Sequence, residues 1–443
     1  MAIDDPQRLT GELLAQAGQL RAQGRSAEAA AFYRRALMLA PGAFDAGFGL
    51  AMAMIEAGNR DGAEKVAAHL LKGHPDNPGA AYLAGRLAAE RGDHSVAVAQ
   101  LEALVGRPRI SPEQRAEALL LLGQSLDSLD RTREAFAAAA QGKAIQRAAN
   151  AARAASREGE VQKLNRLAAW FDRADPAAWR PSQARVPAGA PSAHIVLVGF
   201  PRSGTTLLEQ VLAGHPDVVA LEEAPTLAEP YAEFMTSDAD LRRLAGLGPD
   251  ETRAWRERYW AQVASLGVRA ADRVFLDKAP AGTLYLPLIA KLFPAAKVLF
   301  AVRDPRDVVL SCFRNDFQLN AMTYAFTDLG ETARCYDACM RMADVYRRVL
   351  PLDLHEVRHE TLVEDFDAEL ARIAGFLGIE VTSSMADIAA TARSRVVRTP
   401  SAVQVRAGLN TKGLARWRAY AGELGPVLPM LAPWVERWGY APD

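Results

Sequence analysis

Residues 195–223 read IVLVGFPRSGTTLLEQVLAGHPDVVALEE, and the C-terminal part of the chain can be interpreted outward from them. The stretch opens with a short apolar and β-branched run, Ile195–Val198, which is typical of a buried parallel strand. Two glycines and a proline interrupt the run, and apolar residues recur at helical spacing from Thr205 onward. A strand, a glycine-bearing loop and a helix start direct backbone N–H groups and the positive helix end at one place. The order therefore predicts an anion-binding site.

The glycine spacing narrows the kind of anion. Gly199 and Gly204 are placed like the two glycines of a P-loop, G-x-x-x-x-G-K-[ST], with Thr206 at the hydroxyl position. The lysine position of that motif is Thr205 here, so the loop lacks the cation that holds the β- and γ-phosphates of a nucleoside triphosphate. Arg202 supplies a cation inside the loop instead. The pattern favours an anion other than the γ-phosphate of ATP.

The loop also resembles that of a known family. Residues 201–207 (PRSGTTL), followed by His215-Pro216 and Glu222-Glu223, resemble the 5′-phosphosulfate loop of sulfotransferases that use 3′-phosphoadenosine 5′-phosphosulfate (PAPS). The similarity is to tyrosylprotein sulfotransferases and to bacterial tetratricopeptide-repeat sulfotransferases, and it covers about residues 195–443. It implies that PAPS is the co-substrate, that 3′-phosphoadenosine 5′-phosphate is the product, and that no metal takes part.

The resemblance assigns residues to the donor. The loop residues that it implies as a cradle for the 5′-phosphosulfate are Arg202, Ser203, Gly204, Thr205, Thr206 and Leu207. Arg303 and Ser311, in RDPRDVVLS, match the segment that holds the 3′-phosphate, where a guanidinium can donate two parallel hydrogen bonds. The structural alternative for Arg303 is a surface salt bridge to Asp304 or Asp307.

Further donor contacts are implied near the C-terminus. His359 stands where many relatives have a tyrosine in R-Y-E-x-L, so its contact with the nucleotide is a weaker expectation. Ser401 and Arg406, in TPSAVQVR, resemble phosphate-binding residues of a late loop that closes over the nucleotide.

Two residues are candidates for the chemistry itself. By resemblance, Glu223 is the catalytic base that takes the proton of the acceptor hydroxyl; the alternative is a solvated acidic pair with Glu222. Lys278, in DKAP, matches a lysine near the oxygen that bridges phosphate and sulfate, where it and Arg202 would stabilise developing negative charge. Its alternative role is a surface lysine paired with Asp277. Pro225 replaces the substrate-facing arginine of the tyrosylprotein enzymes.

The first third of the chain is repetitive. Gly24, Gly58 and Gly92 lie 34 residues apart, a period typical of tetratricopeptide repeats. Alanines follow each glycine by five residues, at Ala29, Ala63 and Ala97, and a fourth, weaker copy contains Gly123 and Ala135. The alternative is a plain alanine-rich helical bundle, which the fixed spacing disfavours. The repeats could bind a protein partner, mediate dimerisation or give structural support.

The sequence divides into three parts. We expect a tetratricopeptide solenoid at 1–146, a helical and Pro-rich linker at 147–192, and an α/β sulfotransferase domain at 193–443. The linker is expected to be helical from Arg147 to Asp175. Apolar runs at 274–276 and 297–302 predict two further strands of a parallel sheet. Ligands of such sheets bind beyond the carboxyl ends of the strands, where Arg202, Lys278 and Arg303 should converge.

Composition sets the remaining expectations. The formal net charge of −1 gives no overall field that would recruit nucleic acid. Three cysteines make no disulfide framework, and neither a signal peptide nor an apolar run of membrane length is visible, which predicts a cytoplasmic protein. The sequence does not distinguish between three classes of acceptor: a protein tyrosine, a glycan and a small molecule. The rival functions are a tetratricopeptide scaffold with an inactive nucleotide-binding domain and a P-loop kinase.

Overall fold

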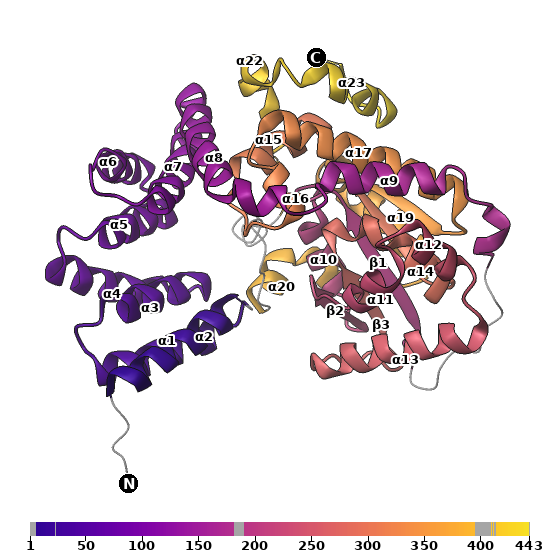
Figure 1. Ribbon diagram of the computed structural model, residues 1–443, viewed down its shortest axis with the longest axis horizontal. Coiled ribbons are helices and arrows are strands. Elements are labelled where there is room, and N and C mark those ends of the chain that lie inside the picture. Colours follow the sequence, from indigo (N-terminus) through magenta and orange to yellow (C-terminus); the bar gives the residue numbers. More distant parts are fainter. Residues whose placement is uncertain are drawn as a thin grey trace, which may run out of the picture. The chain divides into compact units, whose positions relative to one another are not determined.

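The computed structural model describes residues 6–22, 24–180, 190–394, 409, 411 and 413–442 (Figure 1). Contacts divide the chain into two compact units: residues 1–151 with 314–316, and residues 152–313 with 317–443. The first unit is helical, and the second is built on a β-sheet.

The first unit consists of helical repeats, as the 34-residue period predicts, and consecutive helices pack on one another (Figure 1). The N-terminal helices are α1 (Pro6–Ala22), α2 (Ser26–Leu39), α3 (Phe44–Glu56), α4 (Arg60–Gly73), α5 (Pro78–Arg91), α6 (His94–Val105), α7 (Pro112–Ser128) and α8 (Thr132–Ala155). The three spaced glycines all have positive φ, 72° at Gly24, 80° at Gly58 and 84° at Gly92. Each lies at a helix end, because only glycine adopts this conformation without a steric cost.

Small residues let the repeat helices approach closely. Ala29, Ala63 and Ala97 are all completely buried. A Cβ added at Gly49 would lie 2.3 Å from the ring of Tyr33, so only a glycine fits beneath that tyrosine. The small residues in the sequence are therefore spaced at the positions where neighbouring helices pack against each other.

The second unit contains a five-stranded, all-parallel sheet in the order β2-β3-β1-β4-β5. Its strands are β1 (Ala193–Gly199), β2 (Val218–Glu222), β3 (Val274–Lys278), β4 (Lys297–Val302) and β5 (Asp353–Arg358). The strands expected at 195–198, 274–276 and 297–302 are confirmed as β1, β3 and β4. The edge strand β2 was not predicted because it is short, only partly buried and ends at an acidic residue, Glu222.

Helices and 3-10 turns surround the sheet (Figure 1). They are α9 (Glu160–Phe171), η1 (Pro176–Trp179), α10 (Thr205–Ala213), α11 (Ala228–Phe234), α12 (Asp238–Ala245), α13 (Pro249–Ser265), η2 (Pro280–Tyr285), α14 (Leu286–Leu292), α15 (Pro305–Arg314), α16 (Ala321–Ala325), α17 (Leu329–Val349), α18 (His359–Glu364), α19 (Phe366–Leu377), η3 (Ser383–Ala386), α20 (Ile388–Ser394), η4 (Arg416–Tyr420), α22 (Ala421–Leu424) and α23 (Leu428–Arg437).

Different helices pack on the two faces of the sheet. Ile195, Leu197 and Leu299 point to one face and form a core with α10 and α19. On the other face, Phe300 packs under an arginine of α17 and His194 contacts Trp260 of α13. Because both faces are covered, the open place for a ligand is the edge where the strands end.

The helix expected from Arg147 to Asp175 is interrupted. Helix α8 ends at Ala155, and α9 begins at Glu160 with Gly159 as an extended N-cap, φ −67° and ψ 149°. Glycine has poor helix propensity, and the N–H of Gly159 donates a hydrogen bond to the side-chain oxygen of Gln162. Both features favour the start of a new helix over the continuation of α8.

A glycine substitution tests the packing of the repeats. A Cβ at Gly123 in α7 would lie 2.9 Å from the backbone oxygen of Ala135 in α8, so Gly123→Ala should lower the free energy of unfolding by about 1–3 kcal/mol. The matched control is Gly18→Ala in α1, where no described atom lies within 4 Å; it should raise stability by about 0.5–1 kcal/mol. Denaturant unfolding of the two variants measures both. A Gly123→Ala variant as stable as Gly18→Ala would contradict the close contact.

Candidate functional site

The candidate site begins in the loop between β1 and α10. Gly204 is the N-cap of α10 with φ 92°, and Arg202 also has a left-handed backbone with φ 73°. A non-glycine residue in this region costs of order 1–3 kcal/mol and persists only where its surroundings hold it. Arg202 is held: its side chain is buried, and its Nε donates to Oγ of Ser311 on α15 at 2.9 Å.

Both loop glycines are required by their neighbours. A Cβ at Gly199 would lie 2.7 Å from the backbone oxygen of Ala301 in β4. A Cβ at Gly204 would lie 2.4 Å from Nδ1 of His359. The loop is therefore pressed against β4 on one side and against the start of α18 on the other, which brings His359 to the loop.

Arg303 follows β4 and faces the same loop. Its Nη1 donates to the backbone oxygen of Arg202 at 3.2 Å, and its Nη2 to that of Gly413 at 2.5 Å. The ion pair with Asp307 that the alternative predicts is present, with 3.9 Å between the charged atoms, but it is buried and does not lie on the surface. Asp304 is paired with Arg306 instead, at 2.8 Å.

Arg306 ties the turn after β4 to the last described residues. Its guanidinium also donates to the backbone oxygens of Ala441 and Pro442, and it stacks 3.8 Å from the ring centroid of Trp417. Glu360 accepts from the backbone N–H of Asp304. These contacts fix the backbone from which Arg303 projects.

Positive charge is concentrated and poorly solvated at the loop. Burial and the neighbouring Arg303 lower the pKa of Arg202 to about 10. Burial, Arg303 and Arg202 lower the pKa of His359 to about 3, so its ring is neutral near pH 7. Nε of Arg303 and Nδ1 of His359 are buried without a hydrogen-bond partner among the described residues. Buried polar atoms in this state call for a ligand, and phosphate or sulfate oxygens on two arginines fit the chemistry of this donor set.

A second cluster lies at the ends of β2 and β3. Lys278 is completely buried, and its Nζ lies 2.8 Å from Glu223, 3.2 Å from Glu222 and 3.3 Å from Glu209. Burial works against the charged ammonium, but the three surrounding carboxylates outweigh it and raise the pKa of Lys278. The alternative of a surface lysine paired with Asp277 is thus wrong: Asp277 accepts from Tyr259 and Thr226 instead.

Glu223 sits at a strained position. Its backbone has φ 48°, and its N–H donates to the backbone oxygen of Lys278 at 2.8 Å. Its side chain is 44% exposed, whereas that of Glu222 is 9% exposed. The carboxylate that resemblance assigns as base therefore has access to solvent while remaining in contact with Lys278.

Sequence reasoning missed Glu209. It lies on α10, its side chain is 0% exposed, and it contacts Lys278. The available signal was a charged residue between the apolar residues Leu207, Leu208, Val211 and Leu212 of α10, since residues 205–212 are all buried. Ser401 and Arg406 lie outside the described residues, so their assignment remains a prediction.

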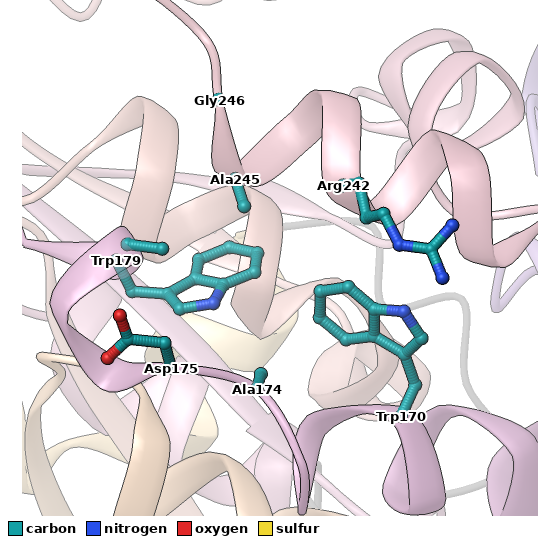
Figure 2. Close-up of a pocket in the computed structure, with 8 residues that line it drawn as sticks. Trp170, Ala174, Asp175, Trp179, Arg242, Ala245 and Gly246 are labelled. Carbon is teal, nitrogen blue, oxygen red and sulfur yellow. The ribbon is translucent and has the colours of Figure 1, made fainter.

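Two cavities lie in the second unit apart from the loop. One, of about 350 Å³, is lined by Trp170, Trp179, Asp175 and Arg242 among others (Figure 2). The other is narrow and is lined in part by Ala224, Asp277 and Ala279, the neighbours of Glu223 and Lys278. Within the described part of the chain, no group of three or more His, Cys, Asp or Glu side chains is arranged to hold a metal ion, and none of the helices could cross a membrane.

The loop, the strand order and the cations together define an α/β domain with a parallel sheet whose glycine loop carries buried arginines. Residues 194–383 match the model of the sulfotransferase family, and residues 20–87 match that of the tetratricopeptide repeat. The C-terminal part of the chain is thus similar to the sulfotransferase family, and its N-terminal helical repeats are similar to tetratricopeptide repeats.

Several proteins are similar to part of this chain. An uncharacterized protein of Aquifex aeolicus (strain VF5) is 27% identical over 253 residues, 55% of this chain and 33% of that protein, so the chain spans about a third of its length. A putative protein-tyrosine sulfotransferase of Caenorhabditis briggsae is 26% identical over 254 residues, 56% of this chain and 88% of that one. The solved sulfotransferase domain of the Synechococcus PCC 7002 olefin synthase is 24% identical, with a TM-score of 0.39, over 59% of this chain and 99% of that domain.

The burial of His359 predicts a pH dependence of stability. Its folded pKa of about 3 lies below the value of 6.5 for an unperturbed histidine, so below pH 6.5 the unfolded chain binds a proton that the folded chain does not. Relative to His359→Asn, the wild-type protein should lose stability as the pH falls, approaching about 1.4 kcal/mol per pH unit. Denaturant unfolding of both proteins from pH 7.5 to 4.5 measures this. A difference that stays constant over that range would contradict a neutral, buried His359.

Proposed function

We propose that this protein is a PAPS-dependent sulfotransferase that moves a sulfuryl group to an acceptor hydroxyl. The observation that carries the proposal is the buried Arg202–Arg303 pair at the glycine loop, with Nε of Arg303 and Nδ1 of His359 lacking partners among the described residues. A donor with a 5′-phosphosulfate and a 3′-phosphate would supply oxygens to these groups. Arg202, Ser203, Gly204, Thr205, Thr206 and Leu207 would cradle the first, and Arg303 with Ser311 the second.

The contact between Arg202 and Ser311 refines this assignment. Ser311 accepts from Arg202 rather than from Arg303, so the loop arginine and the α15 serine form one unit. We infer that this unit lies between the two anionic groups of the donor. Ser311 would then orient the Arg202 guanidinium as well as contact the 3′-phosphate.

The chemical step needs a base and a stabilised leaving group. The acceptor oxygen attacks sulfur, the bond between sulfur and the bridging oxygen breaks, and its electron pair remains on the phosphate of 3′-phosphoadenosine 5′-phosphate. Glu223 would take the hydroxyl proton, since its carboxylate is half exposed at the end of β2. Lys278 and Arg202 would stabilise the negative charge that develops on the phosphate and sulfuryl oxygens.

The acceptor is proposed only as a class. Relatives named protein-tyrosine sulfotransferases support a tyrosine hydroxyl, and tetratricopeptide repeats suit a protein partner. Pro225 occupies the place of the family's substrate-facing arginine, which favours a glycan or small-molecule hydroxyl instead. A cytoplasmic location accords with three cysteines that are all buried.

Calorimetric titration without metal tests the donor. We expect micromolar binding of 3′-phosphoadenosine 5′-phosphate and much weaker binding of AMP, because AMP lacks the 3′-phosphate. Arg303→Ala should reduce the ratio of the two affinities by at least about tenfold, the effect expected from losing one charge-assisted contact to phosphate. Equal binding of the two nucleotides by the wild-type protein would overturn the proposal. Preferential ATP binding with Mg²⁺ would favour a kinase, and no nucleotide binding would favour a scaffold.

Turnover tests the base. Glu223→Gln should reduce kcat by about 10²–10⁴-fold, the usual contribution of a general base, and should leave the fold intact because the side chain is half exposed. Release of 3′-phosphoadenosine 5′-phosphate from PAPS, with a phenol as trial acceptor, measures the rate. The control Glu222→Gln should retain more activity than Glu223→Gln. The reverse order would assign the base to Glu222.

A further inference from the structure

The ammonium group of Lys278 is not accessible to solvent or to a ligand in the free protein. Its side chain is 0% exposed, and three carboxylate oxygens lie within 3.3 Å of its Nζ. Two of its three N–H donors are used by hydrogen bonds to Glu222 and Glu223, and the third side of the ammonium group faces Glu209, an ion-pair contact at 3.3 Å. A donor oxygen can contact Lys278 only after one of the three carboxylates moves.

The three carboxylates are not equally able to move. Glu209 is buried on α10 with a 0% exposed side chain, and Glu222 is 9% exposed at the end of β2. Glu223 is 44% exposed and lies one residue beyond the strand, on a backbone with φ 48°. A buried carboxylate that moved away from the lysine would have to keep its charge in the protein interior without water, which is costly, whereas an exposed carboxylate would be hydrated. Glu223 is therefore the partner that can leave.

We propose that Glu209 and Glu222 are permanent partners that position Lys278, and that donor binding displaces Glu223 from Lys278 and so releases the base to the acceptor. This inference rests on the proposed function and adds a sequence of events to it. Before the donor binds, Glu223 neutralises Lys278. After it binds, a phosphate oxygen takes the third N–H, and the Glu223 carboxylate is available for a proton.

Glu209 is essential to this exchange. When Glu223 departs, Lys278 stays buried and must keep a counter-charge, or the ammonium form becomes costly. The charged groups that face it are Glu209 from α10, Glu222 from β2 and Glu223 from the turn that follows. With Glu209 and Glu222 retained, Lys278 stays protonated and remains aimed at the same point. Glu209 is thus a positioning residue that acts through Lys278.

The exchange sets the order in which the two substrates bind productively, with the donor before the acceptor. An acceptor that arrives first meets a glutamate already engaged with a cation, which makes it a poor base. An acceptor that arrives after the donor meets a free carboxylate next to the bound sulfuryl group. Coupling of this kind limits transfer of the sulfuryl group to complexes in which both substrates are present.

Titration calorimetry with 3′-phosphoadenosine 5′-phosphate on three glutamine variants tests the inference. In Glu223→Gln no ion pair has to be broken, so binding should tighten by about fivefold or more even though turnover is lost. In Glu209→Gln, and likewise in Glu222→Gln, Lys278 loses a permanent partner, so binding should weaken by about fivefold. The matched control is Glu229→Gln on α11, an exposed glutamate that pairs with Arg258, and its affinity should equal that of the wild type.

The signs of these changes decide the outcome. Tightening in all three variants would show general relief of negative charge, and unchanged or weaker binding in Glu223→Gln would show that no displacement occurs; either result overturns the inference alone. Glu222→Gln provides the test if the buried Glu209→Gln variant does not fold. If the wild-type protein fails to bind this nucleotide, the proposed function itself is overturned, and the inference falls with it.

Discussion

The C-terminal unit depends on holding cations, away from water, at the carboxyl edge of a parallel sheet. Arg202, Lys278 and Arg303 follow β1, β3 and β4, three adjacent strands, so the sheet order alone brings them to one edge. A buried charge is expensive unless it is paired, and each of the three is held differently. Lys278 has carboxylates, Arg202 has a hydroxyl, and Arg303 has backbone oxygens. Lys278 is therefore surrounded by carboxylates, whereas the hydrogen bonds described above for the two arginines go to uncharged oxygens.

Backbone strain accompanies this arrangement. Among the described residues, the non-glycine positions with positive φ include Arg202 and Glu223, both candidates for the chemistry. Strain of this kind persists where neighbouring contacts over-determine it. At Arg202 these contacts are the bonds to Ser311 and Arg303; at Glu223 they are the backbone bond and the ion pair to Lys278. Two of the five non-glycine residues with positive φ in the described part of the chain are thus candidate site residues; the others are Asp130, Asp272 and Ala415.

Much of this could be predicted from the sequence because it is local or periodic. The 34-residue glycine spacing gave the repeats, and the apolar runs gave β1, β3 and β4. What could not be predicted depends on partners distant in the chain. Edge strand β2 shows no periodic pattern of its own, and the role of Glu209 appears only when α10 is laid against β3. The contact of Lys278 with three glutamates could not be predicted from its neighbours in the sequence, because all three lie 55 or more residues away. The roles of the site residues themselves stay predictions.

The burial of the cations also determines how strongly the electrostatic field at the site depends on ionic strength. Mobile ions screen charges that are exposed to solvent, with a Debye length of about 8 Å at physiological salt, and screen buried pairs much less. Arg202 and Lys278 are both excluded from solvent. The field that an anionic ligand meets at the loop is consequently set by the packing of the sheet edge, and little by the electrolyte around it. A protein with almost no net charge can in this way keep the local charges of its buried arginines little affected by changes in salt.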